Sequence, residues 1–342
     1  MNPELREKDY KKIANFTGLC LILFVVMFNV TGVASVLISE LIAPFISYDA
    51  YYTISSVLSI ISYLSSFIVP ALILRAILKR FNVLQPMNLE FRLPTSSLLL
   101  IPAGIGVTMT LAYVNSLLLS FLDISDAYAE LVGGTNTVYT AYQILLLYVS
   151  TALVPAVCEE FLFRGTILAN LRPFGQGVAI VVSSVLFGLM HQNPYQLLYT
   201  TAAGVVLGYA YVKTRSIWCP TLIHFFNNAF SVTEQVILSN AKAEVANIVI
   251  PIMDVGIIVV GFICFAVFLA IDAKKQRGKY RDGSFGVLLE ESESYTQRRI
   301  SSRSKLRFFT APGMIIFVIV ALSSVVMTLA MLMLLSGVSV LS

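Results

Sequence analysis

Two adjacent carboxylates and an arginine form the first group of residues that could do chemistry. Glu159, Glu160 and Arg164 interrupt an otherwise apolar stretch of the chain. Adjacent helical residues point about 100° apart, so the two glutamates must face different surroundings. Glu160 and Arg164 have the i, i+4 spacing that favours an ion pair, which would leave Glu159 free to face a cavity. The alternative is that all three charges are solvated at the interfacial end of a helix.

The second group contains the only two histidines of the protein. His191 follows Phe187 by four residues, and His224 precedes Asn228 by four, so each pair shares one face of a helix. A lone histidine in an apolar helix is usually a satisfied core residue, but here both histidines fall in apolar segments that follow the glutamate pair. Such groups could relay protons or supply imidazole and carboxylate ligands to zinc.

The composition excludes a soluble globular protein. Of the 342 residues, 57% are hydrophobic and only 12% are charged, and the mean hydropathy is +0.83. A typical soluble domain has about 25% charged residues. We therefore expect a polytopic membrane protein. The four cysteines lie in apolar stretches without a CxxC pair, so neither a disulfide framework nor a thiolate metal site is expected.

The elements that must position these residues are predicted to be membrane helices. A crossing needs about 20 apolar residues, and about nine stretches qualify, although eight is the alternative count because the fifth and sixth are short. If the N-terminus is cytoplasmic, Lys242 is the one Lys or Arg that faces outside, which supports this orientation. The sequence thus predicts an all-α helix bundle with its N-terminus inside. The predicted segments are 13–42, 51–75, 97–121, 142–172, 177–192, 195–212, 216–239, 250–273 and 313–340.

Three motifs in this order resemble a known family. EExxxR begins at Glu159, FxxxH joins Phe187 to His191, and HxxxN joins His224 to Asn228. A rise of about 1.5 Å per residue places Glu159, His191, His224 and Asn228 at comparable depth in the membrane. The pattern is similar to that of the CPBP family of CAAX proteases and bacteriocin-processing proteins, also called the Abi family.

The resemblance implies an intramembrane endopeptidase. By similarity, Glu159 and His191 would activate a water molecule, whereas His224 and Asn228 would stabilise the oxyanion. Glu160 and Arg164 would orient these catalytic residues, and Phe187 would give structural support.

The resemblance leaves the cofactor unknown, because the family has been described as metallopeptidases. If a metal is present, zinc is the candidate and Glu159, His191 and His224 are its candidate ligands. The chain has no HExxH motif, and its histidines are on separate segments. Water activation without a metal is therefore favoured.

Two other functions stay open. A non-catalytic scaffold or bacteriocin-immunity protein of the same fold is the main alternative, and a proton-coupled transporter is less favoured because no inverted repeat is evident. For the protease we expect a membrane-associated protein or peptide as substrate, the lipid bilayer as surroundings, and no nucleic acid. The bacterial plasma membrane is favoured, with the endoplasmic reticulum membrane as the eukaryotic alternative.

Three regions are expected along the chain. Residues 1–139 would form N-terminal transmembrane helices, and residues 140–235 the catalytic core that resembles the family. Residues 236–342 would form C-terminal transmembrane helices, interrupted by a cytoplasmic loop at 274–312.

Overall fold

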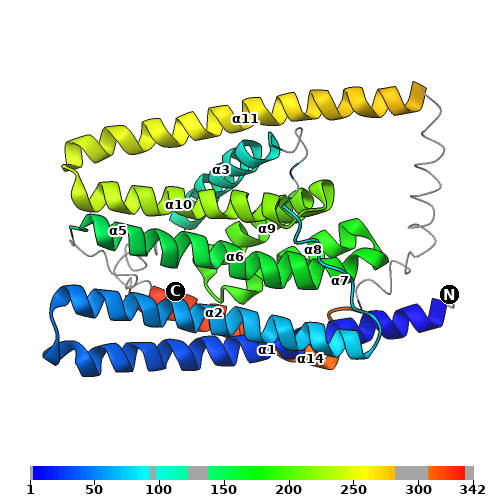
Figure 1. Ribbon diagram of the computed structural model, residues 1–342, viewed down its shortest axis with the longest axis horizontal. Coiled ribbons are helices and arrows are strands. Elements are labelled where there is room, and N and C mark those ends of the chain that lie inside the picture. The colour runs from blue at the N-terminus through cyan, green and yellow to red at the C-terminus, as the bar shows by residue number, and fades with distance from the viewer. Residues whose placement is uncertain (1–2, 92, 94–97, 122–137, 282–306, 336–342) are drawn as a thin grey trace.

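The protein is a bundle of helices that mostly run along the long axis of the molecule (Figure 1). A computed structural model describes residues 3–91, 93, 98–121, 138–281 and 307–335, and all regular elements among them are helical. The predicted all-α class is confirmed. The principal helices are α1 (Pro3–Ile42), α2 (Tyr48–Arg80), α3 (Leu100–Ser120), α5 (Ala141–Leu147), α6 (Val154–Glu160), α7 (Ala169–Leu171), α8 (Gln176–Met190), α9 (Pro194–Thr214), α10 (Trp218–Asn240), α11 (Ala243–Arg281) and α14 (Pro312–Leu335).

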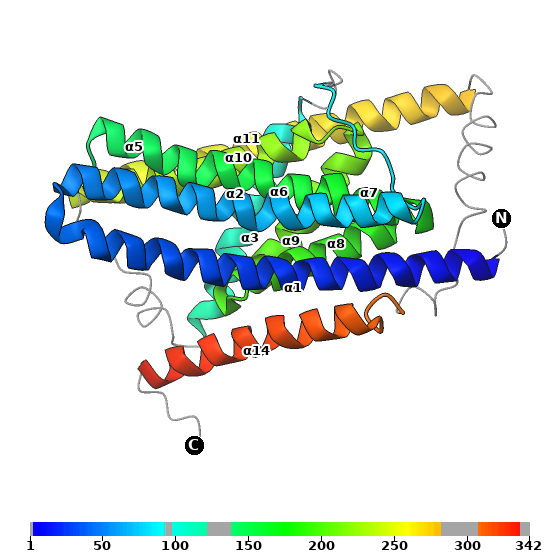
Figure 2. The same ribbon diagram turned by 60° about the horizontal axis from the view of Figure 1, so that its bottom comes forward.

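The helices form two outer groups around a central one. On one side α1 packs against α2 and α14, and on the other side α11 packs against α3. Between these groups lie α6, α8, α9 and α10, which carry the candidate site (Figures 1 and 2). The central group, which carries the candidate site, therefore lies between the two outer groups.

Six of the described helical segments are long and apolar enough to cross a membrane. They are Glu7–Phe45, Tyr48–Arg80, Leu100–Ser120, Ala141–Phe174, Ala243–Lys275 and Pro312–Leu334. The protein is thus a multi-pass membrane protein. The sequence predicts nine crossings, and the other three predicted segments correspond to α8, α9 and α10. These three helices fall outside the six because α8 has only 15 residues and because α9 and α10 carry many polar side chains.

The orientation of the protein in the membrane stays a prediction. Of the predicted cytoplasmic loop at 274–312, residues 282–306 lie outside the described part of the chain. The first part of this loop is instead the end of α11, which continues to Arg281.

Capping residues define where the helices of the site begin. Thr140 and Gln143 form a capping box at the start of α5, in which each side chain binds the other's backbone N–H group. The Asn193 side chain accepts a hydrogen bond from the Tyr195 N–H at the start of α9, and Pro194 takes the first helical position, where its missing N–H costs nothing. Because Gln192 has a φ of 52°, the chain turns sharply between α8 and α9.

The predicted helix at 142–172 is not a uniform α-helix. Two π-helical segments, η3 (Tyr148–Leu153) and η4 (Phe161–Leu168), flank α6. Within η3 the backbone N–H of Val154 donates to the Val149 carbonyl, five residues earlier. Such wide turns are rare and often occur at functional sites. They place the glutamate pair on a short α-helical stretch between two distorted ones.

Glycines allow the closest helix contacts. A Cβ atom on Gly188 of α8 would lie 1.9 Å from Oγ1 of Thr201 on α9. A Cβ on Gly106 of α3 would lie 2.7 Å from the Cα atom of Gly261 on α11. Small residues are typical of helix interfaces in membranes, where close packing replaces the hydrophobic driving force. Gly188 therefore lets α9 pack closely against α8, the helix that His191 follows.

Candidate active site

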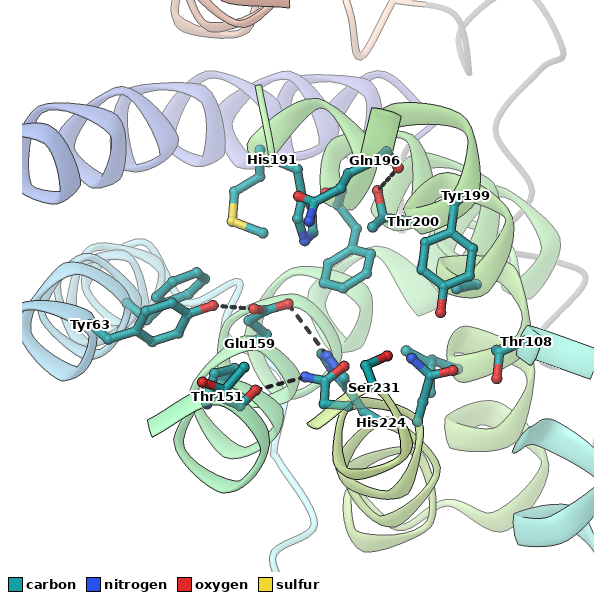
Figure 3. A pocket seen from close by; sticks show the side chains of 18 of the residues that line it. Tyr63, Thr108, Thr151, Glu159, His191, Gln196, Tyr199, Thr200, His224 and Ser231 are labelled. Carbon is teal, nitrogen blue, oxygen red and sulfur yellow. Dashed lines mark hydrogen bonds and ion pairs between the residues drawn. The ribbon is translucent and has the colours of Figure 1, made fainter. Parts of the chain in front are cut away.

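Glu159 lies at the centre of the candidate site (Figure 3). It belongs to α6, and only 3% of the residue is exposed. Its Oε1 atom accepts a hydrogen bond from the Tyr63 hydroxyl of α2. Its Oε2 atom is buried without a hydrogen-bond partner and lies 3.8 Å from His224 Nε2. A separation of 3.8 Å is too long for a direct hydrogen bond between these two atoms.

Glu160 does not line the cavity and instead contacts Arg164 and His224. Its Oε1 atom lies 2.9 Å from Nη1 of Arg164 and 2.9 Å from Nδ1 of His224. The first contact is the ion pair that the four-residue spacing predicts. Glu160 and Arg164 both have 0% exposure, so their pairing must offset a large loss of hydration.

Arg164 connects the glutamate helix to two other helices. Its Nη2 atom donates to the Gly204 carbonyl of α9 at 3.2 Å. Its guanidinium lies 4.5 Å from the ring centroid of Phe187 on α8, within the range of a cation–π interaction. Arg164 therefore connects η4, α8 and α9 from behind the cavity, without lining it.

His191 is held in one tautomer by the backbone. It follows the last residue of α8, and its Nδ1 atom lies 2.7 Å from the Phe187 carbonyl oxygen. A carbonyl can only accept, so Nδ1 carries the proton and donates. The lone pair of neutral His191 is then on Nε2, and the residue lines the same cavity as Glu159. The imidazole can therefore accept a proton in the cavity.

His224 and Asn228 extend from α10. The Nδ1–H of His224 donates to Glu160, which leaves Nε2 directed toward Glu159. Because carboxylates lie on both sides of this ring, an imidazolium would have an acidic partner for each N–H group. The Nδ2 atom of Asn228 lies 3.4 Å from the Thr151 carbonyl oxygen. Asn228 thus offers an amide N–H group at the cavity, and His224 offers its Nε2–H group when it is an imidazolium.

The cavity has a volume of about 580 Å³. Glu159, His191, His224 and Asn228 all line it, whereas Glu160 and Arg164 are not among its lining residues. The structure therefore brings the six predicted residues together but divides them into a cavity group and a supporting group. The cavity also has polar lining residues that the sequence motifs do not include, namely Tyr63, Thr108, Thr151, Gln196, Tyr199, Thr200, Asn227 and Ser231.

Phe187 packs against both histidines. Its ring centroid lies 5.0 Å from that of His191 and 5.9 Å from that of His224, both edge to face. Together with its contact to Arg164, the Phe187 ring thus touches three polar side chains. The structural support that the resemblance implies for Phe187 stays a proposal, which substitution can test.

We expect Phe187→Leu to lower kcat for peptide cleavage by about 10- to 100-fold, because small displacements of catalytic groups are costly. Phe268→Leu is the matched control, since Phe268 is equally buried but belongs to a different hydrophobic cluster. Steady-state kinetics of both purified variants would test this. Equal kcat values for the two variants would show that Phe187 only fills space.

The donors present do not fit a metal site. Among the residues that the structure describes, no three His, Cys, Asp or Glu side chains form a group that could hold a metal ion. The candidate zinc ligands Glu159, His191 and His224 therefore do not make such a group. The reaction proposed below uses no metal.

Tyr63 is the main site residue that sequence reasoning missed. It lies in α2, about 96 positions before Glu159, and a tyrosine in an apolar helix carries no motif. The hydrogen bond between Glu160 and His224 was also not predicted, because it joins α6 to α10. No local spacing rule could have indicated either contact.

Comparison with known proteins adds to this geometry. Residues 141–230 match the model of the type II CAAX prenyl endopeptidase Rce1-like family. This part of the chain is thus similar to that family. The resemblance predicted from the EExxxR, FxxxH and HxxxN motifs is confirmed over these residues. The Rce1-like segment extends from the start of α5 into α10, so it contains the whole motif set.

Two bacterial relatives agree with the Rce1-like assignment. The chain is 33% identical over 91 residues to a Bacillus subtilis (strain 168) protein provisionally named membrane peptidase YdiL, which is 26% of this chain and 37% of the relative. It is 24% identical over 202 residues to the membrane-embedded CAAX protease MroQ of Staphylococcus aureus (strain USA300), which is 57% of this chain and 80% of the relative. The first match thus spans little more than a third of that relative. No solved structure matches the chain at a significant level.

Proposed function

We propose that this protein is an intramembrane endopeptidase of CAAX-protease type that hydrolyses a peptide bond in a membrane-associated protein. One observation carries the proposal. Glu159, His191, His224 and Asn228, from three separate helical segments, line a single cavity of about 580 Å³. The match of residues 141–230 to the Rce1-like family supports the same reaction class. We place the catalytic core in residues 140–235, between N-terminal helices in 1–139 and C-terminal helices in 236–342.

The first step is the activation of water. Glu159, together with His191, takes a proton from a water molecule held beside Oε2 of Glu159. The water oxygen forms a bond to the carbonyl carbon of the substrate, and the electrons of the C=O double bond move to the oxygen. Because Nδ1 of His191 already donates to Phe187, Nε2 of the same ring is the nitrogen available to share this proton.

The second group stabilises the charge that develops. His224 Nε2, as the donor of an imidazolium, and the Asn228 amide donate hydrogen bonds to the oxyanion. Glu160 holds His224 through Nδ1, and Arg164 holds Glu160. When the carbonyl re-forms, the C–N bond breaks and the proton from Glu159 or His191 passes to the leaving amine. The products are a carboxylate and an amine.

The substrate and location follow from the class of protein. A membrane peptidase implies a protein substrate, and a cavity among membrane helices favours a membrane-associated protein or peptide. Both relatives are bacterial, which supports the bacterial plasma membrane as the location.

Cleavage of a library of membrane-tethered peptides by the purified protein tests the proposal. We expect cleavage to persist within about twofold when a strong metal chelator is added, because the described donors do not form a metal site. Loss of cleavage with chelator, and its return with zinc, would show a metal enzyme. Absence of cleavage of any peptide by the wild-type protein would favour the scaffold or immunity function instead.

A further inference from the structure

Tyr63 makes a direct contact with the proposed catalytic carboxylate. Its hydroxyl can donate one hydrogen bond, and the acceptor is Oε1 of Glu159. In Figure 3 the tyrosine approaches Glu159 from α2, on the side opposite His224. The two oxygens of the carboxylate therefore have different environments, since Oε1 binds Tyr63 and Oε2 faces His224 Nε2.

The position of the Tyr63 ring is fixed by its neighbours. The ring stacks on Phe67 at 4.6 Å between centroids and meets the edge of Phe28 at 6.0 Å. The helix that carries it is also fixed, because the hydroxyl of the adjacent Ser62 lies 2.6 Å from the Thr31 hydroxyl on α1. A hydroxyl on such a restrained ring has little freedom to leave Glu159.

We propose that Tyr63 is a positioning residue of the peptidase site, which rests on the function proposed above. Tyr63 occupies Oε1 of Glu159 and fixes the rotation of the carboxylate, so that Oε2 stays free to bind the attacking water. Without the hydroxyl, the carboxylate could turn and offer either oxygen to the cavity. Preorganisation of this kind is a large part of the advantage of enzymes over reactions in water.

The ring of Tyr63 also separates two cavities. It lines the candidate active-site cavity and a second cavity of about 360 Å³ between α1 and α2. Removal of the whole side chain would therefore change the shape of the site as well as the contact with Glu159. Tyr63→Phe is the informative variant, because it removes the hydroxyl and keeps the ring.

Kinetics of Tyr63→Phe on a peptide that the wild-type protein cleaves would test the proposal. We expect kcat to fall about 10- to 100-fold while KM stays within about twofold, since the hydroxyl contacts Glu159 and not the substrate. Tyr52→Phe is the matched control on the same helix, where the hydroxyl lies 3.4 Å from the Gln143 carbonyl oxygen and the residue does not line the cavity. An unchanged kcat in Tyr63→Phe would overturn the proposal.

A second measurement works without a substrate. A hydrophobic carbodiimide modifies buried carboxyl groups, and mass spectrometry can quantify its addition at Glu159. We expect this labelling to be at least about threefold faster in Tyr63→Phe, because Oε1 of Glu159 loses the hydrogen bond from the Tyr63 hydroxyl. We expect the labelling rate to be unchanged in Tyr52→Phe. Equal rates in all three proteins would overturn the positioning role. If no peptide is cleaved by wild-type protein while labelling still responds to Tyr63→Phe, the proposed function fails and the Tyr63 contact stands.

Discussion

Glu159→Gln is expected to lower the rate of peptide cleavage by about 1,000-fold or more. The substitution keeps the size of the side chain and an oxygen that can accept from Tyr63, but it removes the group that takes a proton from water. General base catalysis contributes about 10²- to 10⁴-fold to enzymatic rates. Single-turnover cleavage of the best peptide in the library would measure the loss.

Glu40→Gln is the matched control for this loss. Glu40 is also a glutamate on a membrane helix, and it accepts a hydrogen bond from Tyr51 at 3.0 Å, but it does not line the candidate active-site cavity. We expect its activity to equal that of the wild-type protein. Wild-type cleavage by Glu159→Gln would refute the proposed role of this residue, provided that the variant is inserted and folded.

Arg164→Met is expected to destabilise the fold as well as the site. The arginine is completely buried, and its loss would leave the buried carboxylate of Glu160 without its closest cation. Removing one partner of a buried ion pair typically costs about 3–5 kcal/mol. The change would also remove the contacts to Gly204 and Phe187 that connect α9 and α8 to η4.

Thermal unfolding in detergent, followed with a thiol-reactive dye, would measure this effect. The dye reports unfolding because Cys20, Cys158 and Cys219 are buried free thiols. Arg80→Met, at the exposed end of α2, is the control and should unfold at the wild-type temperature. An Arg164→Met protein as stable as this control would contradict the importance of the buried pair.

A double variant separates stability from chemistry. When Glu160→Leu is added to Arg164→Met, both charges of the pair are gone, and buried pairs replaced by apolar residues often lose little stability. We expect the thermal midpoint to recover in part. Cleavage should stay low, because His224 no longer has the acceptor for its Nδ1–H group.

The sequence by itself determined that this is a membrane protein and indicated the residues that we propose carry its chemistry. High apolar content with few charges indicates a membrane protein. Apolar runs of about 20 residues indicate helices in particular, because in a helix each backbone N–H bonds within its own segment. Charged residues are so costly in such helices that Glu159, Glu160 and Arg164 stood out without any structure. The ion pair of Glu160 with Arg164 was predictable because i, i+4 contacts depend on helix geometry alone.

The number of helices that are long and apolar enough to cross a membrane was less predictable from the sequence. Nine apolar stretches do correspond to helices, yet α8, α9 and α10 are not among the six that are long and apolar enough. These three helices surround a polar cavity, so their composition reflects contact with that cavity as well as with lipid. Hydropathy along the chain cannot distinguish these two environments.

Only the tertiary structure decided which groups touch. The Tyr63 contact to Glu159 joins residues 96 positions apart, and the contact of Glu160 with His224 spans 64 positions. The π-helical segments that flank α6 were equally invisible, because residue types do not encode a change from i+4 to i+5 bonding. Sequence periodicity indicates which face of a helix a residue occupies. The residues that this face contacts depend on how the helices pack, and packing depends on the whole chain.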